Sequence, residues 1–262
     1  MVPREAIGLG ERDGSYLVKL DDGDELVARG VILAVGVQYR RLPIPRLADY
    51  EGLGVAYATD SARQQLRPSD AAVVIGGANS AGQTALALAE DGHQVHLIVR
   101  AACLERSMAR YLRDRIALEP AIHVHLQHEV RELHGHGHLE RIVVEDVITE
   151  QRQTLAAGAM VVLIGAEPRT QWLAGEVALD EDGFVLTGPT LGPDASQRDP
   201  WLALGRGPFV LETSRPGVFA VGDVRSGATR MVAPAVGEGG MAVRLAAEHL
   251  ASDHEPVGSV TS

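Results

Sequence analysis

The stretch AAVVIGGANSAGQ, residues 71–83, decides the fold, because five apolar residues lead into a glycine turn and then into a helical pattern. A continuous apolar run of this kind predicts a strand that is buried on both faces of a parallel sheet. The helix is expected over 80–90, with Asn79 as its N-cap and Gly92 as the residue that ends it. The run at 94–99 predicts the next strand. Together these segments predict a right-handed strand–helix–strand unit.

The glycine turn has the composition of a dinucleotide-binding loop. Such a loop needs a tight turn, a bare backbone against the pyrophosphate and a small residue where the helix meets the strand. Gly76 supplies the first and Ala81 the third, whereas Ala78 stands where the pattern has its second glycine and its methyl group crowds the pyrophosphate. The flanking strand and helix favour NAD(P) binding over the alternative, an ordinary strand-to-helix turn that carries glycines.

Arg100 follows the second of these strands, where an NAD-selective site usually carries Asp or Glu for the ribose 2′-hydroxyl and where Arg suits a 2′-phosphate. Arg106 and Arg110 lie close to it in sequence. Lys19 is the only lysine of the chain, so a solvated basic helix face is the competing interpretation. We expect NADPH rather than NADH.

A third segment, GVFAVGDV at 217–224, predicts a strand that ends at Gly222 and Asp223. A carboxylate there, followed by a helix whose N-terminal N–H groups face the same crevice, can bind polyol hydroxyls and stabilise negative charge on a ring. The alternative is a plain turn, because Gly-Asp is common in turns. A long helix is expected from about Val232 to Leu250.

The remaining segments contain no second motif of this kind. They are expected as strands at 15–20, 25–34 and 160–164, an extended connection over 37–70, a basic amphipathic helix over 107–118, alternating strands over 122–164 with a hairpin at 135–137, and a surface excursion over 188–208.

Composition excludes several classes of protein. The 262 residues, 45% hydrophobic and 23% charged, suit one large domain or two ordinary ones. No apolar run is long enough to span a membrane and no signal segment opens the chain, so we expect a cytoplasmic protein without membrane contact. A net charge of −11 argues against nucleic-acid binding. The single cysteine, Cys103, excludes any mechanism that needs two thiols of this chain.

Six of the ten histidines fall between His123 and His138. His134, His136 and His138 alternate, which could place imidazoles on one side of a hairpin and bind a transition metal. The sequence offers no carboxylate or thiol that completes such a site, so we predict no metal. No Ser-His-Asp arrangement or carboxylate pair stands out, so no catalytic residue is assigned.

Several segments appear in the order of one known family: AVG at 34–36, GGANSA at 76–81, IGAEPRT at 164–170, and TS at 213–214 followed by GVFAVGDV at 217–224. Together they resemble the low-molecular-weight thioredoxin reductase group of FAD- and NADPH-dependent pyridine nucleotide-disulfide oxidoreductases. YRRLPIP at 39–45, NSAGQ at 79–83 and AVGEG at 235–239 are similar to a subgroup often fused to a cyclic-nucleotide-binding domain. The resemblance covers about residues 15–250.

This resemblance implies an α/β protein in which a Rossmann-like NAD(P)-binding domain is inserted in an incomplete FAD/NAD(P)-binding domain of three layers, ββα. The inserted domain is expected over 65–168. The flanking pieces are 1–64, which includes a linker, and 169–262, which carries the C-terminal helix and a polar tail. Hydride would pass from NADPH to FAD and on to an acceptor.

The resemblance also implies which residues bind the cofactors. NADP would be lined by Gly76, Gly77, Asn79, Ser80 and Ala81, with Arg100 near its 2′-phosphate. FAD would be bound by Gly36 beside the adenosine, by Gly222 and Asp223 at the ribityl chain, and by Met231 and Val232 where the helix meets the flavin pyrimidine edge.

The chain departs from the family pattern besides Ala78. Met1 falls inside the FAD domain, so the opening strand, its GxGxxG turn and its acidic ribose partner are expected to be missing. Residues 57–62 stand where the family has its CxxC and contain no cysteine, so dithiol reduction is excluded. We expect electrons to leave the flavin for an acceptor such as a quinone, a ferredoxin-like partner or oxygen.

Two other functions stay open for this chain. The alternatives are a non-catalytic nucleotide-binding remnant and half of an enzyme that another chain completes. The oligomeric state stays open, with a homodimer among the alternatives.

Overall fold

Two separately packed units make up the computed structural model, which describes residues 4–197 and 199–252. Unit 1 combines the two ends of the chain, up to Gln38 and from Ala166 onward, and unit 2 is the continuous segment Tyr39–Gly165. The segments that join the units, β5 (Val37–Tyr39) and β14 (Ala166–Pro168), pair with each other as a two-stranded sheet.

Unit 2 is built on a parallel sheet of five strands in the order β6-β13-β7-β8-β9. Their bounds are Val55–Ala56, Ala159–Val162, Ala72–Ile75, Val95–Val99 and Ile122–Leu126. All four residues of β7 and all four of β13 are buried, which confirms the reading of these apolar runs as strands covered on both faces.

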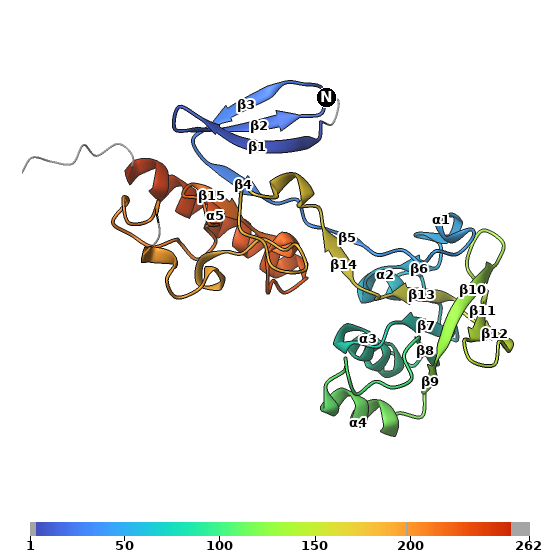
Figure 1. Cartoon of the computed structure of the whole chain (residues 1–262). Helices are drawn as coiled ribbons and strands as arrows, with labels where there is room; N and C mark the ends of the chain where they lie inside the picture. The colour runs from blue at the N-terminus through green and yellow to red at the C-terminus, as the bar shows by residue number, and fades with distance from the viewer. Residues whose placement is uncertain (1–3, 198, 253–262) are drawn as a thin grey trace, which may run out of the picture. The chain divides into compact units, whose positions relative to one another are not determined.

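Each face of this sheet has its own cover. Alternate residues such as Val74 and Leu97 pack against the helices α3 (Asn79–Glu90) and α4 (Arg110–Leu118). Val73 and Ile98 point the other way, toward an antiparallel sheet of β10 (His128–His134), β11 (Arg141–Asp146) and β12 (Arg152–Ala156). Figure 1 shows the helices on one side of the parallel strands and β10–β12 on the other. The predicted hairpin joins β10 to β11.

Unit 1 has three layers. An antiparallel meander of β1 (Ala6–Arg12), β2 (Ser15–Leu20) and β3 (Glu25–Ala28) packs on one face of a two-stranded parallel sheet. That sheet pairs β4 (Val31–Leu33) with β15 (Val218–Ala220), and α5 (Val232–Ser252) packs on its other face. The ββα order is visible in Figure 1 and agrees with the expected fold class.

Several sequence predictions are wrong in detail. The single strand expected over 25–34 is two strands in different sheets, because the chain crosses between the layers at Gly30. The connection over 37–70 is not simply extended, since it contains α1 (Leu47–Tyr50), β6 and α2 (Thr59–Arg63). β6 pairs with β13, so the expected boundary at 64/65 lies inside unit 2.

The remaining segments have little regular structure. The excursion over 188–208 contains only the short 3₁₀ helices η2 (Gly188–Leu191) and η3 (Ala195–Gln197) among its described residues, and two more, η1 (Gln171–Leu173) and η4 (Gly222–Val224), lie in unit 1. None of the helices in the described part of the chain is long and apolar enough to cross a membrane.

Candidate functional site

The glycine turn of unit 2 is closed by packing that excludes larger residues. Gly76 has a φ of +141°, and a Cβ placed on it would lie 2.5 Å from the carbonyl oxygen of Leu163. A Cβ on Gly77 would lie 3.0 Å from Cγ1 of Val99. Ala81 is fully buried where the helix meets the strand. The tight turn and the close helix–strand contact therefore have the residues that a dinucleotide loop needs.

The prediction that Asn79 caps α3 is wrong. Asn79 is the first residue of the helix, and Ala78 is the N-cap, with extended backbone and no side-chain hydrogen bond. Ala78, Asn79 and Ser80 are all exposed. The first N–H groups of a helix have no partner within the helix, so this turn presents free donors beside the glycines. Gly92 does end the helix, with a φ of +92°.

Two hydrogen bonds fasten the loop after β8 to the glycine turn. The Oδ1 atom of Asn79 accepts the N–H of Ala109 at 2.7 Å, and the Ser107 hydroxyl donates to the carbonyl oxygen of Gly77, also at 2.7 Å. Sequence reasoning missed this role because Asn79 and Ala109 are 30 positions apart. The loop and the glycine turn thus form one continuous surface in unit 2.

Three arginines lie on this loop or directly after it. Arg100, Arg106 and Arg110 are exposed. Arg110 pairs with Asp114 at 3.6 Å along its own helix, whereas neither Arg100 nor Arg106 forms an ion pair within residues 4–197 and 199–252. Two cations without carboxylate partners beside a helix N-terminus make an arrangement suited to a phosphate group.

In unit 1 the residues expected to bind FAD gather at one end of the two-stranded sheet. Gly36 follows β4 and Gly222 follows β15, and because these strands are parallel their carboxyl ends share one edge. The N–H of Val221 donates to the carbonyl oxygen of Leu33 at 3.0 Å. Gly36 and Gly222 both have positive φ, +61° and +70°. Asp223 is half-buried, and its carboxylate accepts no hydrogen bond from the described residues.

Glu238, which sequence reasoning did not single out, fixes the Gly222 turn from helix α5. Its Oε2 accepts the N–H of Gly222 at 2.7 Å and the Nε–H of Arg225 at 3.2 Å. Arg225 also donates to the Thr187 hydroxyl at 3.2 Å. Arg225 lowers the pKa of the Glu238 carboxyl below its ordinary value. At the start of this helix, Met231 and Val232 are exposed.

Hydrogen bonds of hydroxyl groups hold the segment at 57–62, which stands where the family has its CxxC. The Tyr57 hydroxyl donates to Glu51 at 2.6 Å, and the hydroxyls of Thr59 and Thr84 lie 2.7 Å apart. Tyr57 also stacks on Tyr39 with ring centroids 5.7 Å apart. No sulfur atom is available there for a disulfide.

The alternating histidines do not converge on a metal. His134 contacts Glu132 at 3.0 Å, His136 is exposed, and the Nε2 atom of His138 is buried with no hydrogen-bond partner. Among the described residues, no group of three or more His, Cys, Asp or Glu forms a metal site.

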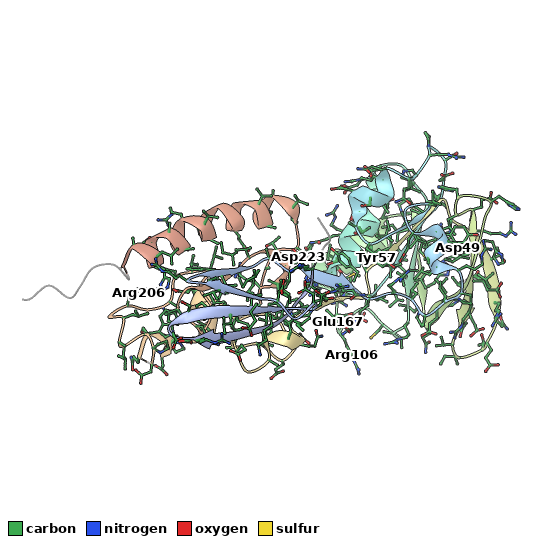
Figure 2. The ribbon with its side chains drawn as sticks, turned by 90° about the horizontal axis from the view of Figure 1, so that it is seen from above. Asp49, Tyr57, Arg106, Glu167, Arg206 and Asp223 are labelled. Atoms are coloured by element: carbon green, nitrogen blue, oxygen red, sulfur yellow. The ribbon has the colours of Figure 1, made fainter. Side chains whose placement is uncertain are left out.

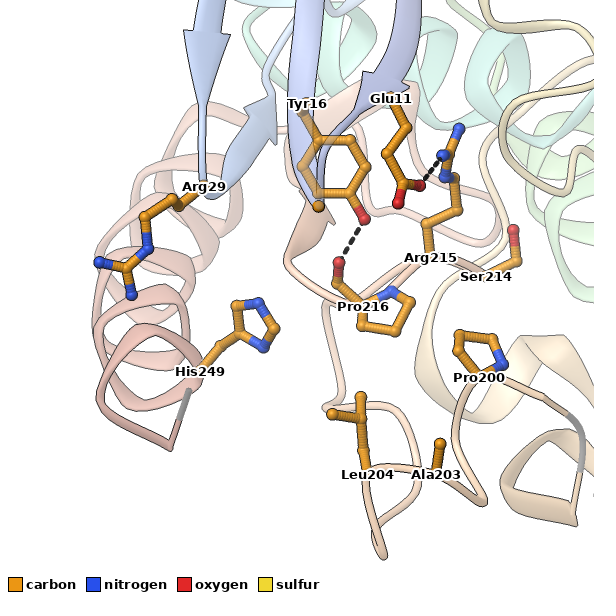
Figure 3. Close-up of a pocket in the computed structure, with 11 residues that line it drawn as sticks. Glu11, Tyr16, Arg29, Pro200, Ala203, Leu204, Ser214, Arg215, Pro216 and His249 are labelled. Atoms are coloured by element: carbon orange, nitrogen blue, oxygen red, sulfur yellow. Dashed lines mark hydrogen bonds and ion pairs between the residues drawn. The ribbon is translucent and has the colours of Figure 1, made fainter. Parts of the chain in front are cut away.

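Unit 1 also contains a cavity of about 380 Å³ that none of the predicted cofactor residues lines. Figure 3 shows its walls, where the Tyr16 hydroxyl donates to the Pro216 carbonyl at 2.5 Å and Arg215 pairs with Glu11 at 2.5 Å. Burial raises the pKa of Tyr16. These polar groups are occupied by one another, so the wall itself does not identify a ligand.

A buried carboxylate lies close to this cavity and is structural. Glu212 is fully buried, and Arg206 binds both of its oxygens, at 2.7 and 3.0 Å. Figure 2 shows Arg206 beside the last turns of α5, where it also contacts Nδ1 of His249 at 3.1 Å. Backbone N–H groups of Phe209 and Gly217 complete the environment of Glu212, so its charge is satisfied within the fold.

Comparison with known sequences gives one consistent result. The sequence model described as "Pyridine nucleotide-disulphide oxidoreductase" matches residues 4–239. The chain is 30% identical to a thioredoxin reductase of Yarrowia lipolytica, over 95% of this chain and 72% of that protein. It is 31% identical to a thioredoxin reductase of Neurospora crassa, over 95% and 69%, and 28% identical to a "34.2 kDa protein in rubredoxin operon" of Clostridium pasteurianum, over 89% and 71%.

Solved structures give the same fold. The Lactococcus lactis thioredoxin reductase superimposes with a TM-score of 0.64 at 25% identity, covering 95% of this chain and 74% of that one. The thioredoxin reductase of Giardia duodenalis has a TM-score of 0.77 at 21% identity, over 95% and 75%. The similarity spans both units and about three quarters of each of those chains.

Proposed function

Because the chain belongs to the pyridine nucleotide-disulphide oxidoreductase family, we propose that it oxidises NADPH and reduces an acceptor without a disulfide of its own. NADPH is the electron donor in this proposal. The turn at Gly76 and Gly77, the free N-terminal turn of α3 and the nearby arginines would hold it in unit 2. Bound FAD would supply the redox chemistry, accepting a hydride and releasing electrons.

The observation that carries the nucleotide assignment is the pair of unpaired cations, Arg100 and Arg106, on a loop fastened to the glycine turn. A 2′-phosphate brings negative charge to that loop, which favours NADPH over NADH. Gly77 lets the glycine turn pack closely against β8, because a Cβ there would lie 3.0 Å from Cγ1 of Val99.

The residues of unit 1 fit the ring and ribityl portion of FAD better than its pyrophosphate. Asp223 has a carboxylate that accepts no hydrogen bond from the described residues and is available to polyol hydroxyls, and Met231 and Val232 are exposed at the start of α5. Among the described residues of unit 1, no strand leads through a glycine-rich turn into a helix in the way that β7 leads into α3. The described residues of unit 1 therefore offer the FAD pyrophosphate no helix N-terminus of the kind that the glycine turn of unit 2 presents.

The cysteine content of the chain limits how electrons can leave the flavin. Cys103 is the only cysteine, so no disulfide of this chain can relay electrons. We propose that the electrons leave the flavin directly for a quinone, a ferredoxin-like partner or oxygen. NADPH oxidation by the flavin-loaded protein, followed with each acceptor in turn, tests this. Turnover with none of the three would contradict it.

Calorimetric titration of the purified chain with NADPH and NADH tests the donor. NADPH is expected to bind tighter, and Arg100→Gln is expected to weaken NADPH about tenfold while leaving NADH unchanged, since one charge-assisted hydrogen bond is lost. Arg110→Gln is the matched control, because that arginine already pairs with Asp114. Equal weakening of both nucleotides by Arg100→Gln would contradict the assignment.

A second candidate function rests on the uncovered surface of unit 1. β4 pairs only with β15 among the described strands, and Ile32 and Val35 beside its open edge are 38% and 40% exposed. On α5, Val232, Val236 and Val243 share one face of the helix and are 81%, 70% and 62% exposed. An unpaired strand edge and an exposed apolar helix face are surfaces that proteins normally cover, so we propose that a further polypeptide segment, a strand followed by a helix, completes this unit.

Flavin titration separates these candidates. A purified chain that takes up FAD and turns yellow overturns the second candidate. The second candidate is supported if the chain stays colourless and binds a dye that fluoresces on apolar surfaces. The double variant Val236→Ser, Val243→Ser is then expected to abolish the dye signal. A colourless chain that binds NADPH but not the dye is a non-catalytic nucleotide-binding remnant. Mass measurement in solution shows whether a homodimer covers the face instead.

A further inference from the structure

Four histidines lie together at one edge of the parallel sheet of unit 2. We call His96 on β8, His123 and His125 on β9, and His128 on β10 the histidine cluster. The ring centroid of His96 lies 5.5 Å from that of His123 and 5.2 Å from that of His125, and the centroids of His125 and His128 are 5.5 Å apart. Nδ1 of His96 and Nε2 of His125 are 3.1 Å apart, within hydrogen-bond distance.

The groups that face the cluster offer little compensation for a positive charge. Across from it, β12 contributes the Gln153 amide, 3.3 Å from Nδ1 of His125. β11 contributes Asp146, whose Oδ1 already accepts two backbone N–H groups of the following turn at 2.8 and 3.0 Å. Gln94, just before β8, contacts Nε2 of His123 at 3.3 Å.

Other charged groups nearby belong to the opposite face of the antiparallel sheet. Glu129, Arg131, Glu145 and Arg152 are linked to one another by ion pairs there. The main electrostatic neighbours of His96 and His125 are therefore other imidazoles, whereas His128 also interacts with the Asp146 carboxylate. Burial, followed by the charges of His96, His128 and His123, lowers the pKa of His125 to about 4, and burial with His123 lowers the pKa of His96.

The cluster is joined to the nucleotide loop through the corner between β9 and β10. Gln127 at this corner donates its N–H to the carbonyl oxygen of Ala101 at 3.1 Å, and its own carbonyl accepts the N–H of Val147 at 2.8 Å. Ala101 directly follows Arg100. β9 is an edge strand, paired only with β8 among the described strands, so it is the element most easily displaced.

We propose that the histidine cluster is a pH-sensitive switch on the nucleotide site: acid charges the imidazoles, their repulsion loosens β9 and its corner, and the support of the Arg100 loop is lost. The nucleotide readout rests on the proposed function, whereas the loosening of β9 does not. The direction follows from linkage. The pKa of His125 is lower in the folded chain than in the unfolded one, so stability is fully present above the unfolded value near 6.5 and falls as the pH drops toward about 4.

Amide hydrogen exchange of the wild-type chain tests the structural half. After correction for intrinsic rates, the amides of β9 and of Gln127 are expected to lose protection at least about tenfold more than those of β7 between about pH 7.5 and about pH 5. Unchanged relative protection overturns the proposal.

Binding tests the coupling. Over the same pH range the NADPH dissociation constant of the wild type is expected to rise about tenfold more than that of His125→Gln. The comparison cancels the titration of the 2′-phosphate, which falls in this range. His136→Gln, at an exposed position, is the matched control and should follow the wild type. Parallel curves for wild type and His125→Gln overturn the switch, and a chelator that abolishes the pH effect overturns it in favour of a bound metal. No NADPH binding at any pH overturns the proposed function and leaves the exchange experiment intact.

Discussion

The two units use the same element, a parallel strand followed by a turn that carries glycine, in surroundings of very different completeness. In unit 2 the turn at Gly76 leaves a five-stranded sheet whose two faces are both covered. In unit 1 the turn at Gly222 leaves a two-stranded sheet with one open edge and an exposed apolar helix face. On the proposed assignment, the nucleotide site of unit 2 is built within one continuous segment, whereas the flavin site of unit 1 lies beside an open strand edge and an exposed helix face.

The largest expected effect on stability comes from a substitution that disrupts the glycine turn of unit 2. Gly76→Ala places a Cβ 2.5 Å from the carbonyl oxygen of Leu163 at a φ of +141°, so we expect a loss of about 3 kcal/mol or more in the free energy of unfolding. Urea denaturation measures this. Gly240→Ala in α5, where the new Cβ meets no atom within 4 Å, is the control and should stabilise the chain by about 0.5–1 kcal/mol. Equal effects of the two substitutions would refute the steric argument.

A smaller effect is expected when the turn of unit 1 is released. Glu238→Gln removes the charge that holds Arg225 and the N–H of Gly222, so we expect about 2 kcal/mol of destabilisation. Arg225 keeps the pKa of Glu238 below its ordinary value, so this contribution is present above about pH 4.5 and is lost as the pH falls through the lower folded value. Denaturation of both proteins against pH measures it. A difference that stays constant down to about pH 3 would contradict the ion-pair origin.

The smallest effect sharpens the picture of the nucleotide loop. Ala78→Gly removes the exposed methyl at the N-cap of α3, and we expect NADPH to bind about three- to tenfold more tightly. Glycine is also the better N-cap, so the helix gains a few tenths of a kcal/mol or more. Calorimetric titration beside a thermal melt separates the two effects. A more stable protein with unchanged affinity would show that the methyl does not obstruct the nucleotide.

The sequence predicts unit 2 better than unit 1 for a physical reason. The run 71–75 is apolar throughout, and Gly76 and Ala81 occupy positions where only small residues fit, so local pattern and tertiary packing agree there. In unit 1 the apolar pattern continues across Gly30 while the chain changes sheets, and nothing in its periodicity marks the crossing. β1 was not predicted from the sequence, because it contains Gly8 and Gly10 and strands rarely contain glycine.

The contacts that sequence reasoning missed in the site join residues that are far apart in the sequence. Asn79 has a residue type that favours capping its own helix, yet its partner is the N–H of Ala109 on the next loop. Glu238 lies in a glycine-rich helix, and only the fold brings it to Gly222. Resemblance to a family predicted the cofactor-binding residues, but the contacts that orient them depend on packing that no local pattern specifies.

The hydrogen bonds from Asn79 and Ser107 have a consequence for how coenzyme preference can change. They link the glycine turn, proposed to bind the pyrophosphate, to the loop that is proposed to distinguish the two ribose forms. An exchange of residues 100–106 alone would keep both hydrogen bonds, whereas a transplant that also replaced Ser107 by a residue without a hydroxyl would lose the bond to Gly77 and keep the one between Asn79 and the backbone N–H of Ala109. We therefore expect an engineered change of coenzyme preference to succeed when residues 76–109 are exchanged together.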